Sequence, residues 1–460
     1  MSTNTIDSVV SFRNSQGDKA TGTLRGISRQ TVSIEVYNPY SIVQLSEVLS
    51  NLSIRRATRE IYNGRAVVSS LVNTGIYLVI SAALVDPWQD LSGVTEDDEA
   101  IEKEVERFLG DWDIANKLSP SFTLIVSRLR SLLSELSRWL DQVDLMNSVK
   151  HSNEGDDKIM SKLESLLLPN LNEEFMAFED VAEKIEPDDL VLHSAFAQRD
   201  LHPYLLRAPF VWRAYNKPLG YAGDYEMVNM MLSGFNQGPT THAKVVNDLF
   251  LAAGPALAHR NRIDILVGYL EKVIEKAAKE KRPAKVLNIG CGPAEEIQRL
   301  LGSQKIRKED LDLTLLDFND ETLGYTQSKI SDACKMQDSS VEPTFIHKSV
   351  HELLKDSARQ NAKPEYDMVY CAGLFDYLSD KVCSRLVKLF YQQTIEGGKV
   401  LVTNVHPRNP GRQIMEFLME WHLIYRNEAQ MDAIYPGHGK QKNFCDDSGV
   451  NIFLDIDKSS

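Results

Sequence analysis

Two glycines at the end of a short apolar run are the first residues that suggest a chemical role. The stretch 285–301 reads KVLNIGCGPAEEIQRLL. Its residues 286–289 have the apolar pattern of a strand that is buried on both faces, and the run ends at Gly290, Cys291 and Gly292. The sequence therefore predicts a strand, a tight turn and a helix, with a nucleotide-like ligand lying over the turn.

The residues after the turn distinguish between two kinds of nucleotide. A dinucleotide-binding turn has a third glycine at the position of Glu295, and a pyrophosphate sits on the helix N-terminus there. Here Glu295 and Glu296 stand at the helix start, where two carboxylates would repel a pyrophosphate. A ligand that carries a sulfonium and an ammonium group meets no such repulsion. The turn therefore favours S-adenosylmethionine over a nicotinamide dinucleotide.

A second apolar run, 311–316, ends in an acid. Asp317 follows the run directly, and Phe318 and Asn319 come next. At the carboxyl end of a second parallel strand, the Asp317 carboxylate is placed to accept hydrogen bonds from both hydroxyls of a ribose. Phe318 would then lie beside the adenine. The second strand thus supplies the other half of a nucleoside site.

This order of strand, glycine turn, helix, strand and acid resembles the class I S-adenosylmethionine-dependent methyltransferases. The resemblance implies a Rossmann-like α/β domain with a seven-stranded sheet. The sequence departs from the family pattern at Asn288, where an acid is common, and at Ala294, where many members have a glycine. A glycine-turned α/β unit that binds nothing is the alternative, and the acid at position 317 argues against it.

Later apolar runs are expected to complete the sheet and the site. The runs 344–348, 366–371, 397–405 and 451–456 predict further strands, and 415–425 predicts a helix. The carboxyl ends of parallel strands meet at one edge of a sheet, so residues after such runs lie near the glycine turn. The residues that we expect to contact the cofactor are Tyr221, Gly223, Asp224, Arg260, Asn288, Gly290, Gly292, Glu295, Asp317, Phe318, Asn319, Ser349, Val350, Cys371 and Gly373.

The loop 216–226, NKPLGYAGDYE, has two possible structures. It suits a lid over the cofactor, because glycines permit close approach and Tyr221 and Asp224 can contact a sulfonium or an amino group. It equally suits a turn in which Asp224 caps a helix that starts near Tyr225. With the glycine turn and the later GLFDY at 373–377, this loop resembles bacterial methyltransferases of the 3-hydroxypalmitic acid methyl ester biosynthesis type. That resemblance covers the chain from about 200 onward and implies a carboxylate acceptor.

The predicted catalytic residues are Asp376, Tyr377, His406 and Arg426. Methyl transfer from a sulfonium is an in-line displacement, in which alignment and exclusion of water contribute most. A fatty carboxylate is ionised at pH 7 and needs no base, so Arg426, His406 and Tyr377 would hold it. A hydroxyl or amine acceptor needs a base, and His406 or Asp376 would serve.

The first part of the chain, 7–88, alternates apolar and polar residues in short runs, which predicts a small β-barrel. It resembles a PilZ-type barrel, whose binding members hold cyclic di-GMP. Arg55 and Arg59 have the arginine spacing of that family, but the candidate turn 26–31 lacks the acid and the closing glycine, and the arginines follow it. We expect a degenerate PilZ-like barrel used for packing or for partners, with cyclic di-GMP binding as the alternative.

From about 97 the apolar residues recur with the period of a helix. A face marked by Ile125, Leu129, Leu136 and Leu140 predicts one long helix, and a second helical group follows the polar stretch 147–158. The protein is thus expected to be multidomain, with a PilZ-like β-barrel at 1–90, an α-helical region at 91–200, and a methyltransferase domain with an N-terminal lid at 201–460.

The composition excludes several classes of partner. The 460 residues include 51 Lys and Arg and 65 Asp and Glu, a formal net charge of −14, which leaves no large basic face for nucleic acid. No signal-peptide pattern opens the sequence, and the longest apolar run, 76–85, is about half of what a bilayer span requires. The five cysteines lack C-x-x-C spacing, which suits free thiols in a reducing cytoplasm.

We therefore expect a cytoplasmic enzyme without a transmembrane segment or a metal site. His347 and His351 have the spacing of helical metal ligands, but the run between them leaves a strand and enters a loop. The expected partners are a small-molecule or lipid-like acceptor and, as an open option, a second copy bound through the N-terminal or helical region. The alternatives to a fatty-acid methyltransferase are an O- or N-methyltransferase of another metabolite and a regulatory protein that senses S-adenosylmethionine or cyclic di-GMP without turnover.

Overall fold

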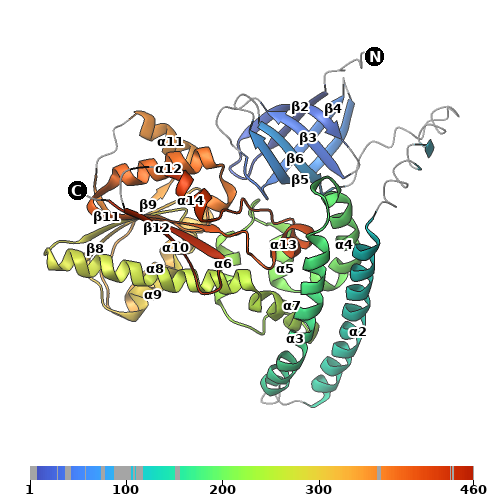
Figure 1. Cartoon of the computed structure of the whole chain (residues 1–460). Coiled ribbons are helices and arrows are strands. Elements are labelled where there is room, and N and C mark those ends of the chain that lie inside the picture. The colour runs from blue at the N-terminus through green and yellow to red at the C-terminus, as the bar shows by residue number, and fades with distance from the viewer. Residues whose placement is uncertain are drawn as a thin grey trace. The chain divides into compact units, whose positions relative to one another are not determined.

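The chain forms two compact units, each built from segments that are far apart in the sequence. Figure 1 shows the computed structural model, which describes residues 8–27, 30–36, 43–56, 59–73, 78–86, 105, 106, 109, 118–150, 156–359, 364–435, 437 and 440–458. The first unit comprises Met1–Ala222, Phe235–Leu251 and Gly411–His422. The second comprises Gly223–Gly234, Ala252–Pro410 and Leu423–Ser460.

The first unit begins with a closed barrel of antiparallel strands in the order β1-β2-β3-β6-β5-β4. The alternation read from the sequence explains it: in β3, Val32, Ile34 and Val36 are buried and the residues between them are not. The predicted barrel is therefore confirmed. Its strands are β1 (Ser8–Arg13), β2 (Lys19–Ile27), β3 (Thr31–Val36), β4 (Val48–Arg56), β5 (Arg59–Asn73) and β6 (Leu78–Leu84).

The arginine pair that suggested cyclic di-GMP is described only in part. The Arg55 side chain is exposed on β4, with its Nε 4.0 Å from Oε1 of Glu60. The side chain of Arg59 and residues 28 and 29 of the candidate turn lie outside the described residues. The PilZ-like identity and cyclic di-GMP binding therefore stay predictions.

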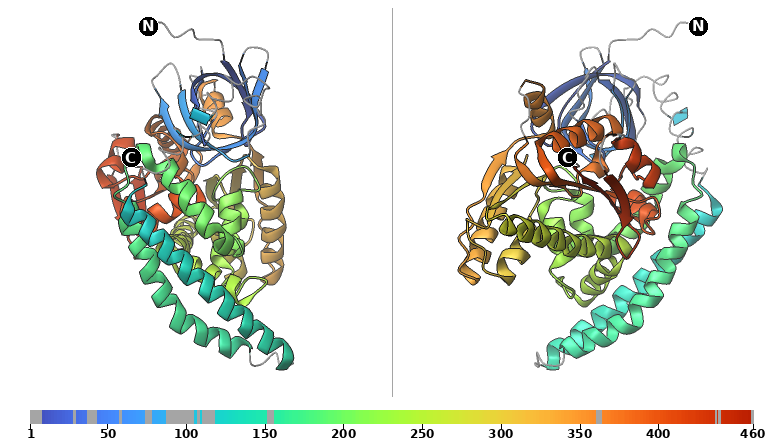
Figure 2. Two further views of the ribbon diagram at one scale, coloured as in Figure 1. Left: turned by 90° about the vertical axis from the view of Figure 1, so that its right-hand side faces the viewer. Right: turned by 60° about the vertical axis from the view of Figure 1, so that its left-hand side comes forward.

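Helices make up the rest of the first unit, and an aromatic cluster joins three of them. Phe122, Phe178 and Phe417 pack with ring centroids 5.5 to 6.1 Å apart. The two long helices α2 and α3 lie side by side in both views of Figure 2. The helices of this unit are α2 (Pro120–Lys150), α3 (Asp156–Ala182), the 3-10 turn η2 (Pro187–Asp189), α4 (Leu190–Leu205), α5 (Pro209–Asn216), α7 (Thr241–Ala252) and α13 (Arg412–Met419).

The helix predicted at 415–425 is wrong in its bounds. Helix α13 starts at Arg412 and stops at Met419, because Glu420 takes a left-handed conformation with φ 49° and ψ 38°. The Glu420 carboxylate accepts hydrogen bonds from Gln198 and His422, so tertiary contacts fix the break. At the other end, Glu179 of α3 accepts from the backbone N–H groups of Gln413 and Ile414 and caps the helix.

The second unit contains a mostly parallel sheet in the order β12-β13-β11-β10-β7-β8-β9. β9, β8, β7, β10 and β11 are parallel, whereas β13 runs antiparallel to β11 and β12 to β13. Strand β12, KQKNFC, was not predicted from the sequence, because this edge strand consists mainly of polar residues and lacks an apolar run. The strands are β7 (Ala284–Ile289), β8 (Leu311–Asp317), β9 (Thr344–His347), β10 (Tyr366–Cys371), β11 (Thr394–Val405), β12 (Lys440–Cys445) and β13 (Asn451–Asp457).

Both faces of this sheet are covered by helices, which explains the continuous apolar runs of its central strands. Residues of α8, α9 and α10 form one core with the sheet, and residues of α12 and α14 form the other. None of the helices in the described residues combines the length and apolar character needed to cross a bilayer. The helices of this unit are α6 (Tyr225–Leu232), α8 (Gly254–Lys279), α9 (Glu295–Ser303), α10 (Asp320–Met336), α11 (Val350–Arg359), the 3-10 turn η3 (Phe375–Tyr377), α12 (Asp380–Gln393) and α14 (Glu428–Ile434).

A buried acid in the first unit makes stability depend on pH. Asp248 of α7 has no exposed surface, and both of its oxygens accept from the backbone N–H of Asn236, at 2.9 and 3.1 Å. Burial, and to a lesser extent the neighbouring Glu164 carboxylate, raise the pKa of Asp248. The folded protein therefore keeps a proton that the unfolded chain releases, and stability falls as the pH rises through the raised pKa.

Asp248→Asn imitates the protonated acid and should remove this dependence. We expect the thermal midpoint of the wild type to fall between about pH 6 and about pH 8 by roughly 2–4 °C more than that of the variant. Differential scanning fluorimetry across that range measures the difference. Asp180→Asn, which changes an exposed acid of α3, is the control and should follow the wild type. Parallel curves for wild type and Asp248→Asn would contradict the prediction.

Candidate functional site

The candidate site lies at the carboxyl ends of β7, β8 and β10. β7 is the central strand of the three and pairs in parallel with both of the others. The chain continues from β7 to β8 and β9 on one side, and then returns to β10 and β11 on the other. The carboxyl ends of β7 and β10 therefore flank the point where the strand order reverses, which is where open α/β sheets bind their ligands.

The glycine turn after β7 is held by backbone hydrogen bonds to the next strand. The N–H groups of Gly290 and Cys291 both donate to the Leu316 carbonyl, at 2.8 and 3.0 Å. Gly290 and Gly292 have φ values of 66° and 52°, which favour glycine. The Gly292 carbonyl in turn accepts from the Thr326 hydroxyl of α10 at 2.7 Å. The turn is thus fixed in a shape that leaves open space over Gly292, whereas the Leu374 side chain lies against Gly290.

Asp317 joins the turn to the end of β8. Its Oδ2 accepts from the N–H of Gly292 at 3.0 Å, and its Oδ1 accepts from the N–H of Asn319 at 3.1 Å. The residue is 5% exposed, and burial raises the pKa of Asp317 while these backbone hydrogen bonds lower it. A carboxylate can accept about four hydrogen bonds, so each oxygen retains acceptor capacity for a ligand. Asn319 itself caps α10 by accepting from the Thr322 N–H.

The two glutamates at the start of α9 face different surroundings. Glu295 pairs with Arg299 at 3.1 Å. Glu296 is buried, and its Oε1 accepts from the Asn288 amide at 3.0 Å and from the Tyr370 hydroxyl at 2.7 Å. The amide of Asn288 is therefore used inside the protein, and burial raises the pKa of Glu296. Both glutamates therefore stand at the helix start, as the sequence suggested, but Glu296 is buried and hydrogen-bonded inside the protein.

The tip of β10 places Cys371, Gly373, Asp376 and Tyr377 close along the chain. Cys371 is fully buried, and Gly373, with φ 94°, donates its N–H to the Thr403 hydroxyl at 3.1 Å. Asp376 is 3% exposed and accepts from the Val405 N–H at 2.6 Å. Burial raises the pKa of Asp376. Tyr377 follows on the same 3-10 turn and is half-buried.

A buried arginine on α8 lies against this tip. Arg262 is 6% exposed, and its Nη1 would be 3.0 Å from a Cβ added at Gly373. Its Nη2 lies 2.7 Å from a ring nitrogen of His259. In the sequence, the run AHRNR at 258–262 offers Arg260 and Arg262 as anchors for the cofactor or a substrate carboxylate, and Arg260 was the one expected to contact the cofactor. Arg260 instead donates to the Met231 carbonyl of α6 at 2.9 Å.

The loop before α6 forms a capping turn. Asp224 is buried, and its Oδ1 accepts from the Met227 N–H at 2.9 Å, so it is the N-cap of α6. Gly223 precedes it with φ 73°. Tyr225 donates to Glu321 at 2.8 Å and packs on Tyr325, which places the start of α6 beside the start of α10. Tyr221 belongs to the first unit and is half-buried there.

The residues after β9 also serve a helix start. Ser349 donates from its N–H and its hydroxyl to Glu352, and its hydroxyl accepts from the Glu352 N–H. This reciprocal pair caps α11. Val350 packs against the core of the sheet. The carbonyl of Phe318 lies 2.7 Å from the ring of His347, and Phe318 is half-buried at the end of β8.

Two of the predicted catalytic residues are engaged by the protein. The His406 ring accepts from the Arg408 N–H at Nδ1, and its Nε2 lies 3.3 Å from Glu428. Arg426 is almost fully buried, and all five of its donors are used: Nε and Nη2 bind Asp380, Nη2 also binds the Leu378 carbonyl, and Nη1 binds the Phe375 carbonyl and Asn404. Arg426 therefore has no donor left for an acceptor, and it fixes η3.

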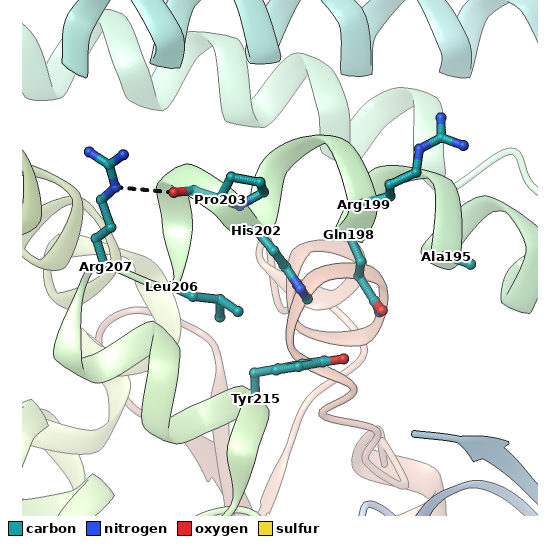
Figure 3. A pocket seen from close by; sticks show the side chains of 8 residues that line it. All are labelled: Ala195, Gln198, Arg199, His202, Pro203, Leu206, Arg207 and Tyr215. Atoms are coloured by element: carbon teal, nitrogen blue, oxygen red, sulfur yellow. Dashed lines mark hydrogen bonds between the residues drawn. The ribbon is translucent and has the colours of Figure 1, made fainter. Parts of the chain in front are cut away.

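The first unit has a surface hollow of about 660 Å³ between α4 and α5. Figure 3 shows His202, Leu206 and Tyr215 around it, with Arg199 and Arg207 at its edges. His202 lies 2.9 Å from the Leu418 carbonyl, and the Gln198 amide donates to the Phe417 carbonyl and to Glu420. These polar groups hold α13, so we assign the hollow a structural role. The described residues contain no group of His, Cys, Asp and Glu that could hold a metal ion.

Comparison with known proteins gives remote structural likenesses. No protein-family model matches the chain, and no curated protein matches it. A possible exported protein from Bordetella parapertussis is 17% identical over 60% of this chain and 100% of that chain, with a TM-score of 0.42. Magnesium protoporphyrin IX methyltransferase (ChlM) from Synechocystis PCC 6803 with bound SAH is 13% identical over 58% and 99%, with a TM-score of 0.35. The S-adenosylmethionine-dependent methyltransferase SibL in its apo form is 14% identical over 73% and 96%, with a TM-score of 0.37. At these TM-scores the likeness assigns no activity to this chain.

Replacing Arg426 should destabilise the second unit. In Arg426→Met, buried acceptors at Phe375, Leu378 and Asn404 lose their donor, so we expect a loss of about 3–5 kcal/mol in the free energy of unfolding. Urea unfolding followed by circular dichroism measures it. The control is Arg408→Met, which removes an exposed arginine paired with Glu428 and should cost at most about 1 kcal/mol. Equal stability of the two variants would show that Arg426 is not a structural anchor.

Proposed function

We propose that this chain is an S-adenosylmethionine-dependent methyltransferase that acts on a small-molecule acceptor. The observation that carries the proposal is the pairing of the Gly290–Gly292 turn with the buried Asp317 carboxylate through the Gly292 N–H. A nucleoside over this turn would meet backbone on one side. On the other side it would meet an acid with free acceptor capacity for the ribose hydroxyls.

The charges around the turn favour a cationic cofactor. Glu296, Asp317 and Asp376 are buried at or behind the strand ends, and Glu295 stands at the start of α9. A pyrophosphate would be repelled by these carboxylates, whereas a sulfonium and an ammonium group would be attracted. When bound, S-adenosylmethionine supplies a methyl group on a good leaving group. The residues of the chain then have to hold the donor, align the acceptor and exclude water.

The hydrogen bonds made by the rings of His406 and His259 favour a methyl acceptor that needs no general base. Both ring nitrogens of His406 are occupied by Arg408 and Glu428, and the ring of His259 is occupied by Arg262. An ionised carboxylate is nucleophilic at pH 7 without loss of a proton, so methyl ester formation needs no free histidine. We therefore propose a carboxylate acceptor, with the carboxylate of a 3-hydroxy fatty acid as its most specific form. Tyr377 is the residue that we propose to contact it, and Asp376 would be the base for a hydroxyl or amine acceptor instead.

Cofactor binding tests the proposal through Asp317. We expect the wild type to bind S-adenosylhomocysteine, and Asp317→Asn to bind it about 10- to 100-fold more weakly, because a hydrogen bond to a charged group contributes about 1.5–3 kcal/mol. Isothermal titration calorimetry measures both affinities. Asp312→Asn, an exposed acid on the same strand, is the matched control and should bind like the wild type. Failure of the wild type to bind would overturn the proposal.

The acceptor can be tested separately. The protein is incubated with methyl-labelled S-adenosylmethionine and fatty acids of several lengths, with and without a 3-hydroxyl group. We expect the label in an ester, which mass spectrometry of the lipid extract detects and mild alkali releases. Label in an ether or an amine would contradict the carboxylate acceptor but would leave the methyltransferase proposal standing.

A further inference from the structure

Arg262 is a buried cation without an anionic partner. It is 6% exposed, its Nε is buried without a hydrogen-bond partner, and none of the described carboxylates comes within ion-pair distance of it. Its one hydrogen-bonding neighbour is the ring of His259, one turn earlier on α8. Other buried cations of the chain are satisfied: Arg426 uses all five donors, and the Lys217 ammonium donates to two carbonyls.

An unpaired buried guanidinium is expensive. Removing a charge from water costs several kcal/mol unless an opposite charge or hydrogen bonds replace the solvent. Asp376 and Glu296 are near enough to act on Arg262 through space, but each is held by other donors and neither pairs with it. The arrangement therefore leaves the cation to be neutralised by something that binds.

The position of Arg262 defines what can bind there. The guanidinium lies against Gly373 at the tip of β10, where an added Cβ would be 3.0 Å from Nη1 and 3.2 Å from Nη2 and would crowd the guanidinium. Gly373 therefore keeps the approach to the guanidinium open. A planar fork of donors fits a carboxylate in two parallel hydrogen bonds. Glu296 and Asp376 nearby disfavour the second negative charge of a phosphate, so a monoanion fits better.

His259 fixes the direction of this fork. Its ring lies 2.7 and 3.1 Å from the Arg262 Nη2, so a ring nitrogen accepts from the guanidinium and the ring is neutral. Burial and, after it, the charge of Arg262 lower the pKa of His259 well below its usual value, which agrees with a neutral ring. The hydrogen bond uses one of the two Nη2 hydrogens, so one two-donor edge of the guanidinium, formed by the other Nη2 hydrogen together with Nε or Nη1, remains for a ligand.

We infer that Arg262 is the receptor for the amino-acid carboxylate of the cofactor and that His259 is its positioning residue. This rests on the proposed function, because S-adenosylmethionine carries a carboxylate at the end opposite its adenosine. It extends that function by assigning the carboxylate of the ligand to one residue of α8, Arg262, and by giving His259 the task of orienting it.

The test compares two ligands that differ only in this group: S-adenosylmethionine and decarboxylated S-adenosylmethionine. Calorimetry gives the preference of each protein for the carboxylated ligand. We expect a preference of about 10- to 100-fold in the wild type and within about twofold of unity in Arg262→Met, a double-mutant-type comparison that isolates the pair. Arg299→Met, which changes a half-exposed arginine of α9, is the control and should keep the preference.

His259 is tested by rescue. His259→Ala removes the acceptor for Nη2 and should lower the preference for the carboxylated ligand, whereas His259→Gln supplies a neutral acceptor and should restore it. A role confined to packing would change the affinity for both ligands alike.

The thermal midpoint of ligand-free Arg262→Met should equal or exceed that of the wild type, because an apolar side chain replaces an unpaired charge.

The outcomes separate this inference from the function on which it rests. If Arg262→Met keeps the full preference for the carboxylated ligand, Arg262 is not the receptor, while the dependence of binding on Asp317 still supports the methyltransferase. If Arg262→Met is too unstable to measure, Arg262→Lys, which keeps the charge and loses the fork, should retain part of the preference, and full retention would overturn the two-bond geometry. If the wild type binds neither ligand, both proposals fail.

Discussion

The hydrogen bonds that join the glycine turn of β7 to the end of β8 are the interaction on which the site depends. Leu316 accepts two of them through its carbonyl, and Asp317 accepts the third through its carboxylate. The same three donors would otherwise be unpaired in a buried turn, at a cost of about 1–3 kcal/mol each. The acid at 317 thus has a structural task in the free protein, and its remaining acceptor capacity is what the proposed nucleoside would use.

A combined structural and ligand-binding role would explain why the ends of these strands carry three buried carboxyl groups. Asp317, Glu296 and Asp376 are each held by at least one donor of the protein, and burial still raises the pKa of all three. A protein that only needed a stable sheet would be better served by apolar residues at these positions. Their presence at the point where the strand order reverses supports the binding site that we propose there.

The sequence predicted the backbone of the site better than its side chains. The glycine turn and Asp317 follow from local rules, because a turn after a buried strand needs positive φ and a strand end faces the ligand. The assignments of His406 and Arg426 to the reaction centre depended on what those side chains contact, and their partners Glu428, Asp380 and Asn404 are brought to them only by the folded chain. The bounds of the helix predicted at 415–425 were wrong for the same reason. The backbone of Glu420 is left-handed and ends the helix, and its side chain contacts Gln198 and His422 only in the folded chain.

Hydrogen bonds within each unit also fix the chain segment that leads from α13 to Arg426. The Ser46 hydroxyl of the barrel donates to the His422 carbonyl and accepts from the His422 N–H. Two residues later, the Ile424 N–H donates to the Asp376 carbonyl, and Arg426 then binds η3 from within the second unit. The segment that carries α13 is thus fixed at His422 by one unit and at Ile424 by the other. These hydrogen bonds leave the segment little conformational freedom. Fixing each residue costs about 1–2 kcal/mol of conformational entropy, which the hydrogen bonds must offset. Each unit therefore fixes its own part of this segment, through Ser46 in the first unit and through Asp376 and η3 in the second.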